Sequence, residues 1–132
     1  MENANENENG TWSEEDERVF FHRLIGFEVL DRDGNRVGVV DAVFEDEPDR
    51  REFLGMRLGT LGLGRLRLVP AQFAEIDENT RKIKFPFPAH MLERAPAFDG
   101  DFEFGSESER KVYDYYRQAG FPFEEYGIHE RL

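Results

Sequence analysis

The sequence has no cysteine among its 132 residues. Disulfide bonds, thiol nucleophiles and cysteine metal ligands are therefore excluded together, and the fold must be stabilised by packing. The sequence also has no apolar run near the ~20 residues that a membrane-spanning helix needs, and its first residues lack the basic start and apolar centre of a signal peptide. We therefore expect a cytoplasmic bacterial or archaeal protein without a membrane span.

Positive charge is also scarce, because 17 Lys and Arg residues face 29 Asp and Glu residues and leave a formal net charge of -12. Such a chain repels phosphate backbones at long range, so its charge argues against nucleic acid as a partner unless a local basic patch opposes the overall field. A basic protein surface suits the charge better. We therefore expect the partner to be another protein or a second copy of the chain.

The sequence lacks a convincing catalytic or metal-binding constellation. His22, His90 and His129 do not stand at zinc-motif spacing with further ligands, and no serine lies in a Gly-x-Ser-x-Gly context. The glycines of residues 55–64 precede a predicted strand, whereas phosphate-binding loops open a helix, so we interpret them as structural. The acidic residues 45–49 do not have EF-hand spacing, which favours a solvated turn. We predict a protein that is not an enzyme and has no catalytic, cofactor-binding or metal-binding residues.

Apolar and aromatic residues are present in sufficient number for one compact domain with tails. Hydrophobic residues make up 39% of the chain, and 13 of them are phenylalanine. Residues 1–18 are rich in Glu and Asn and cannot bury enough apolar surface to offset the entropy of ordering, so we expect a mobile acidic tail there. The predicted barrel domain covers residues 19–100, and residues 101–132 form a helix followed by an aromatic arm.

The central residues alternate with the period of a β-strand. An Asp-Gly pair in residues 31–35 predicts a tight hairpin turn, and the glycine-rich residues 55–64 supply the corners that a barrel needs. The first three strands follow one another as an antiparallel meander. We predict a mainly β fold, a small six-stranded antiparallel barrel. Its strands cover residues 27–31, 36–45, 52–58, 65–69, 73–77 and 82–85.

Three helices are predicted around these strands. Ser13 can cap a helix over residues 14–24, and Pro88 can begin a short helix over residues 89–94 that Pro96 ends. A capping box of Ser106 and Glu109 begins the last helix, which ends at Gly120. The tyrosines of this last helix are predicted to dock on the barrel rather than to stack on bases; they are Tyr113, Tyr115 and Tyr116.

Several short segments together resemble the PRC-barrel family. They are Leu24-Ile25-Gly26, Gly34, Gly38, Asp41, residues 61–64, Val69-Pro70, and a stretch ending in Ala95-Pro96-Ala97-Phe98. The resemblance implies a PRC-type β-barrel with a short helix packed at its end. Members include the cytoplasmic part of the photosynthetic reaction-centre H subunit and the C-terminus of a ribosome maturation factor. Without the transmembrane helix of the former or the extra barrel of the latter, this chain is similar to the free-standing members, some of which are linked to stress responses.

Two hypotheses for function follow. The first is a non-catalytic adaptor or scaffold that binds a protein partner or self-associates through aromatic side chains: Trp12, Tyr113, Tyr116, Phe121, Phe123 and Tyr126. The alternative is a small-anion or RNA-binding module that uses Arg57, Arg65 and Arg67. Because carboxylates are abundant nearby, pairing of these arginines with acidic residues of the same chain is the interpretation we favour.

Overall fold

The computed structural model describes residues 20–46, 51–59, 64–99 and 102–118. Its strands are β1 (Glu28–Leu30), β2 (Arg36–Asp46), β3 (Arg51–Leu58), β4 (Leu66–Pro70), β5 (Glu75–Asp77), β6 (Lys82–Lys84) and β7 (Ala97–Phe98). Its helices are the 3-10 turn η1 (Ala71–Phe73), α2 (Ala89–Glu93) and α3 (Ser106–Gln118). Residues 20–22 are also helical, as expected for the end of the first predicted helix; residues 14–19 of that helix lie outside the described residues.

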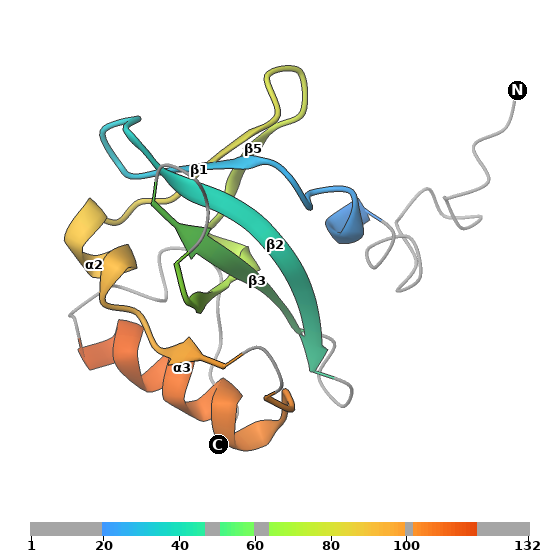
Figure 1. The fold of residues 1–132 in the computed structure, drawn as a ribbon, viewed down its shortest axis with the longest axis vertical. Helices are drawn as coiled ribbons and strands as arrows, with labels where there is room; N and C mark the ends of the chain where they lie inside the picture. The colour runs from blue at the N-terminus through green and yellow to red at the C-terminus, as the bar shows by residue number, and fades with distance from the viewer. Residues whose placement is uncertain (1–19, 47–50, 60–63, 100–101, 119–132) are drawn as a thin grey trace, which may run out of the picture.

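The strands form one mainly antiparallel sheet with the order β5-β6-β1-β2-β3-β4-β7. β1 to β3 form the predicted meander, β4 continues it, and the long strand β2 curves strongly (Figure 1). Among the described residues, the edge strands β5 and β7 do not pair with each other, so the barrel is not closed. The mainly β fold class is confirmed.

The strand arrangement differs from the prediction at two places. β7, a two-residue strand paired with β4, is a seventh strand beyond the six expected. β6 runs parallel to β1, although an antiparallel barrel was predicted. The reason is that the β5–β6 hairpin folds back beside the first strand of the meander. Sequence periodicity identifies a strand but not its partner across the barrel.

The segment that joins β4 to β5 also departs from the expected strand over residues 73–77. Pro70 ends β4 with a φ of -63°, and Ala71–Phe73 form η1 before β5 begins at Glu75. Proline fixes φ and has no N–H for a further ladder bond, so a turn is favoured after it. The turn buries Phe73 in the core.

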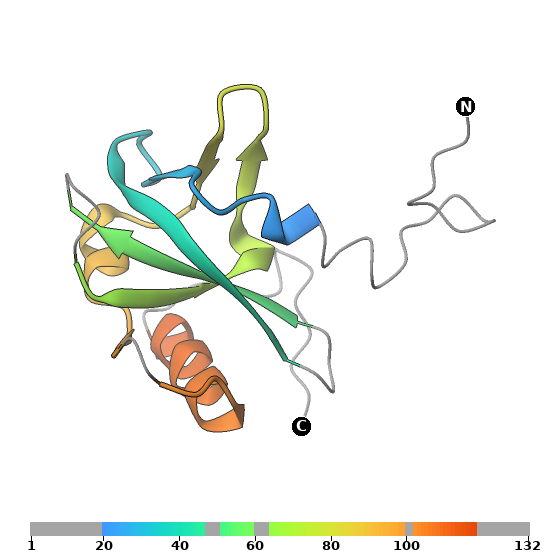
Figure 2. The ribbon, with the colours of Figure 1, turned by 45° about the vertical axis from the view of Figure 1, so that its right-hand side comes forward.

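Both later helices lie against the sheet on the side of β4 (Figure 2). α2 begins directly after Pro88, as predicted. α3 begins at Ser106 as predicted, but its cap differs: the Ser108 hydroxyl donates to the Gly105 carbonyl and accepts its N–H, each at 2.9 Å. Glu109 instead lies beside Arg51, with 3.8 Å between Oε2 and Nε. Within the part of the chain described, no helix has the length and apolarity needed to cross a membrane.

Gly55 illustrates why the glycine-rich region is structural. A Cβ at this position would lie 3.0 Å from Leu66 Cδ1 and 3.1 Å from a ring carbon of Phe44. Both neighbours are side chains that pack across β3, so a larger residue would push the strands apart. The prediction of structural glycine is confirmed at Gly55, whereas Gly62 lies outside the described residues.

Candidate functional site

Tyr113 and Tyr116 of α3 belong to the core, and Tyr115 is half-buried against it, with its hydroxyl donating to the Met91 carbonyl. Tyr116 is 0% exposed, and its ring lies 4.8 Å from the Phe87 ring and 6.1 Å from the Phe73 ring, centroid to centroid. Its hydroxyl donates to the Leu68 carbonyl at 3.4 Å. Burial raises the pKa of the Tyr116 phenol well above its ordinary value. The predicted docking on the barrel is therefore confirmed for Tyr116.

Tyr113 is also buried, with 6% of its surface exposed. The Arg51 guanidinium lies over its ring at 5.0 Å, and its hydroxyl donates to Gln72 Oε1 at 3.3 Å. Burial raises the pKa of Tyr113, and the neighbouring Arg51 partly opposes the rise. Tyr113 thus links α3 to β3 and holds the Gln72 side chain in place.

This placement corrects the assignment of two residues to a partner-binding surface. Tyr113 and Tyr116 fill the interior between α3 and the sheet, so neither offers free contact area. The spacing on the helix identified the right face, but that face is used within the chain. The other proposed interface residues lie outside the described residues; they are Trp12, Phe121, Phe123 and Tyr126.

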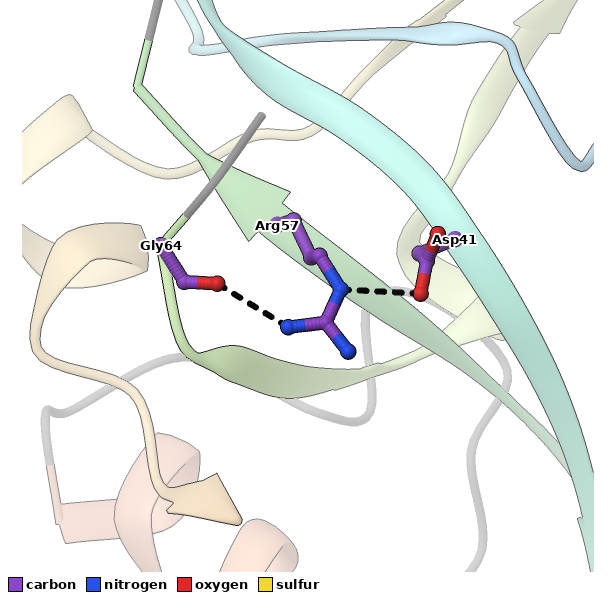
Figure 3. Close-up of polar contacts among 3 residues, drawn as sticks. All are labelled: Asp41, Arg57 and Gly64. Carbon is purple, nitrogen blue, oxygen red and sulfur yellow. Dashed lines mark hydrogen bonds and ion pairs between the residues drawn. The ribbon is translucent and has the colours of Figure 1, made fainter. Parts of the chain in front are cut away.

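We name Arg57, Arg65 and Arg67 the arginine trio. Arg57 Nε lies 2.9 Å from Asp41 Oδ2, and its other arm donates to the Gly64 carbonyl at 3.0 Å (Figure 3). Arg65 lies 3.4 Å from Asp99 Oδ1, and Arg67 donates to the Ala95 carbonyl. The favoured interpretation, pairing with carboxylates, is confirmed for Arg57 and Arg65.

The strand register also separates the trio. Arg57 lies opposite Leu66, whereas Arg67 lies opposite Met56. Directly opposed residues of an antiparallel pair project to the same face, and neighbours along a strand project to opposite faces. Arg57 and Arg67 therefore emerge on different faces of the sheet, and the three side chains do not form the single anion-binding patch that their sequence spacing suggested.

The turn between β1 and β2 positions a further cation, Arg32. Asp31 is buried, and its Oδ1 accepts the N–H groups of Asp33 and Asn35 at 2.9 and 2.8 Å. Gly34 supplies the positive φ of +87° that the turn requires. The Arg32 N–H donates to the Phe87 carbonyl at 2.9 Å. The turn chemistry predicted here is confirmed, and it fixes the backbone from which the Arg32 side chain extends.

A pocket of about 530 Å³ lies beside this turn. The turn and the β5–β6 hairpin extend from the same end of the barrel (Figures 1 and 2). The base of the pocket includes the buried rings of Phe73 and Phe85. The complete lining is Arg32, Gln72, Phe73, Ala74, Glu75, Lys84, Phe85 and Pro86, contributed by the β1–β2 turn, η1, β5, β6 and the residues that follow η1 and β6.

The cations of this pocket are not compensated like the arginine trio. Within the described residues, the Arg32 and Lys84 side chains make no hydrogen bond or ion pair. Glu75 lies opposite Lys84 in the register of β5 and β6 and is the one carboxylate of the lining. Gln72 accepts the Tyr113 hydroxyl bond through Oε1, which leaves its amide N–H groups as donors. The lining therefore combines an apolar base with a small excess of positive charge and donors.

The remaining sequence candidates do not gather into a site. Among the residues that the structure describes, no three His, Asp or Glu side chains come together as metal ligands. Of the acidic turn over residues 45–49, residues 47–49 lie outside the described ranges, as does His129. The pocket is therefore the candidate site that the described structure supports.

A model of the PRC-barrel domain matches residues 16–92, more than half of the chain. The chain belongs to the PRC-barrel domain family. One solved structure similar to it is a protein described as a 16S ribosomal RNA processing protein, RimM, from Pseudomonas aeruginosa, at 25% identity and a TM-score of 0.43. The match covers 52% of this chain and 43% of that protein, so it spans less than half of RimM. No curated protein matches the sequence.

Every residue that lines the pocket lies within the PRC-barrel match, whereas α3 lies beyond it. Sequence reasoning missed the pocket because its cations come from positions 32 and 84, far apart in the chain. The available signals were weak: an arginine inside a rigid turn, and Lys82 and Lys84 at alternate positions of a short strand. The parallel pairing of β6 with β1 brings these segments together.

Proposed function

We propose that this PRC-barrel protein is a non-catalytic cytoplasmic adaptor that binds a protein partner through the pocket at the end of its barrel. The observation that supports the proposal is a pair of cations, Arg32 and Lys84, that line a partly apolar pocket and make no ion pair within the described residues. Apolar surface that leaves the water on binding supplies binding energy, and charges in the lining select and orient the partner. A role in a stress response is part of the proposal and rests on the family resemblance.

The aromatic residues outside the described ranges remain in the proposal as a second contact region. They are Trp12, Phe121, Phe123 and Tyr126. Aromatic side chains provide large contact areas at low entropic cost, which is why they are frequent at the centres of interfaces. The anion-binding alternative through the arginine trio has no comparable support, because an anion would have to displace Asp41, Asp99 and a backbone carbonyl.

The test is capture of the partner by the tagged, full-length chain from lysate of its own organism at low salt. The variant R32E/K84E reverses the pocket charges, and K82E/K111E changes the net charge equally at exposed positions outside the pocket lining. We expect a stoichiometric protein partner that is retained by the control and lost with the pocket variant. Equal capture by both variants would contradict the proposal, and so would capture of RNA in place of protein.

The same assay tests the second contact region. Trp12→Ala and Phe123→Ala should each weaken capture while the circular dichroism and unfolding curve of the barrel stay unchanged. If both variants fold and capture the partner as before, these residues are not part of the interface.

A further inference from the structure

We propose that the pocket recognises one acidic side chain flanked by aromatic residues in an extended segment of the partner. The inference rests on the proposed adaptor function and names the chemistry that the pocket would select. It is carried by two cations that make no ion pair within the described residues and by an amide donor, which surround an aromatic base; these residues are Arg32, Lys84, Gln72, Phe73 and Phe85.

The donors at the edge of the pocket suit a carboxylate. The planar guanidinium of Arg32 can make two parallel hydrogen bonds to a carboxylate, whereas the ammonium of Lys84 acts as a point charge. The Gln72 amide adds a neutral donor, and the bond from the Tyr113 hydroxyl fixes its orientation. The Arg32 backbone is held by its own N–H bond to the Phe87 carbonyl. These constraints lower the entropy that would be lost when a carboxylate binds.

The base of the pocket suits an apolar neighbour of that carboxylate. Phe73 and Phe85 are almost fully buried, and the Phe87 ring supports them, with its centroid 5.1 Å from Phe73 and 6.3 Å from Phe85. The half-buried Ala74 and Pro86 complete the apolar lining, and an aromatic side chain laid against them would remove apolar surface from water on both partners. A volume of about 530 Å³ exceeds what one carboxylate needs, so space remains for the adjacent side chain.

The same pocket disfavours a polyanion. Glu75 lies opposite Lys84 and would repel a second negative group close to the first. The chain as a whole carries a formal charge of -12, which opposes the approach of phosphate backbones. One carboxylate beside apolar groups is therefore a better match than nucleic acid or a run of acidic residues.

The probe is the peptide acetyl-Ser-Phe-Glu-Phe-Ser-amide, titrated into the full-length, ¹⁵N-labelled protein and followed by NMR. Its matched control replaces Glu by Gln, and a second control replaces both Phe by Ala. We expect shifts centred on the pocket and an affinity at least about tenfold higher for the acidic aromatic peptide than for either control. Equal binding of the Glu and Gln peptides would overturn the proposal, and so would displacement of the peptide by an oligouridine.

Three variants should weaken, strengthen and leave unchanged the affinity for the acidic peptide, a combination that misfolding cannot produce. Arg32→Gln should weaken binding of the acidic peptide by about tenfold, because it removes the charge-assisted bonds. Glu75→Gln should strengthen binding by about two- to fivefold, because it removes a nearby like charge. Lys82→Gln is the control on the same strand, outside the pocket lining, and should leave the affinity unchanged.

The outcomes separate the two proposals. If the peptide fails to bind but capture of the partner is still lost in R32E/K84E, the adaptor function stands and the chemistry inferred here is wrong. If R32E/K84E captures the partner as well as the wild type does, the proposed function is wrong, whether or not the peptide binds.

Discussion

The arginine trio and the pocket both carry cationic side chains, but only those of the trio have bonding partners within the described residues. Arg57 is held by Asp41 and the Gly64 carbonyl, whereas Arg32 and Lys84 extend beside an apolar base with no partner among the described residues. The trio is close in sequence and looks like a binding patch, but its charges are used to stabilise neighbouring strands. The pocket cations are far apart in sequence and come together only through the fold.

The difference shows what to look for in an acidic chain. The sequence has 29 Asp and Glu residues against 17 Lys and Arg residues, so arginines that are close in sequence can pair locally, as Arg57 and Arg65 do. A cation that makes no ion pair in the described fold is more informative where it lines a pocket, because a negative group of a partner can reach it there. Substitutions in each region can show whether the two sets of cations have separate roles.

The largest effect is expected at Tyr116, which supports both regions at once. Its hydroxyl bonds to Leu68 of β4, the strand that carries Arg67, and its ring packs on Phe73 and Phe87 beneath the pocket. Tyr116→Ala should lower the free energy of unfolding by about 3–5 kcal/mol, the usual cost of deleting a buried aromatic ring. Urea unfolding measures the change. A loss below about 1 kcal/mol would show that α3 is not needed by either region.

Tyr116 also predicts an alkaline limit to stability. Because burial raises its pKa in the folded state, unfolding releases the phenol proton once the pH exceeds the unfolded value near 10. The contribution of the neutral phenol is therefore complete below that pH and is lost as the pH rises towards the folded-state pKa. Between about pH 8 and 12, the free energy of unfolding should fall less steeply with pH for Tyr116→Phe than for the wild type. Identical slopes would mean that the phenol reaches water before the chain unfolds.

Much of the fold could be predicted because it depends on local patterns. Three local signals act within a few residues: the Val- and Phe-rich run of residues 36–45, the Asp-Gly turn after Asp31 and the proline before α2. The structure has each element where they indicate it. The parallel pairing of β6 with β1 and the added β7 could not be predicted in this way, because they depend on contacts across the barrel.

The candidate site was less accessible to sequence reasoning for the same reason. The spacing of Val112 and Tyr116 identified the buried face of α3 but not whether a partner or the barrel itself covers it. The positions of Arg57 and Arg67 suggested a shared patch, and only the register of β3 with β4 shows that they lie on different faces. Arg32 and Lys84 carry only a weak signal until the sheet is assembled.

The smallest effects are expected when one cation of each region is neutralised and the change in the free energy of unfolding is compared. Arg57→Gln should cost about 0.5–1 kcal/mol, because it breaks a partly exposed ion pair and leaves the Gly64 carbonyl without its donor. Arg32→Gln should change the free energy of unfolding by less than about 0.5 kcal/mol, because its side chain makes no bond within the described fold. Urea unfolding at low and high salt distinguishes the two variants. High salt screens the ion pair of Arg57 with Asp41, so the difference in unfolding free energy from the wild type should shrink for Arg57→Gln only. If Arg32→Gln proved as destabilising as Arg57→Gln, the pocket cation would be structural like the trio, and its loss from a binding assay could no longer be attributed to a partner.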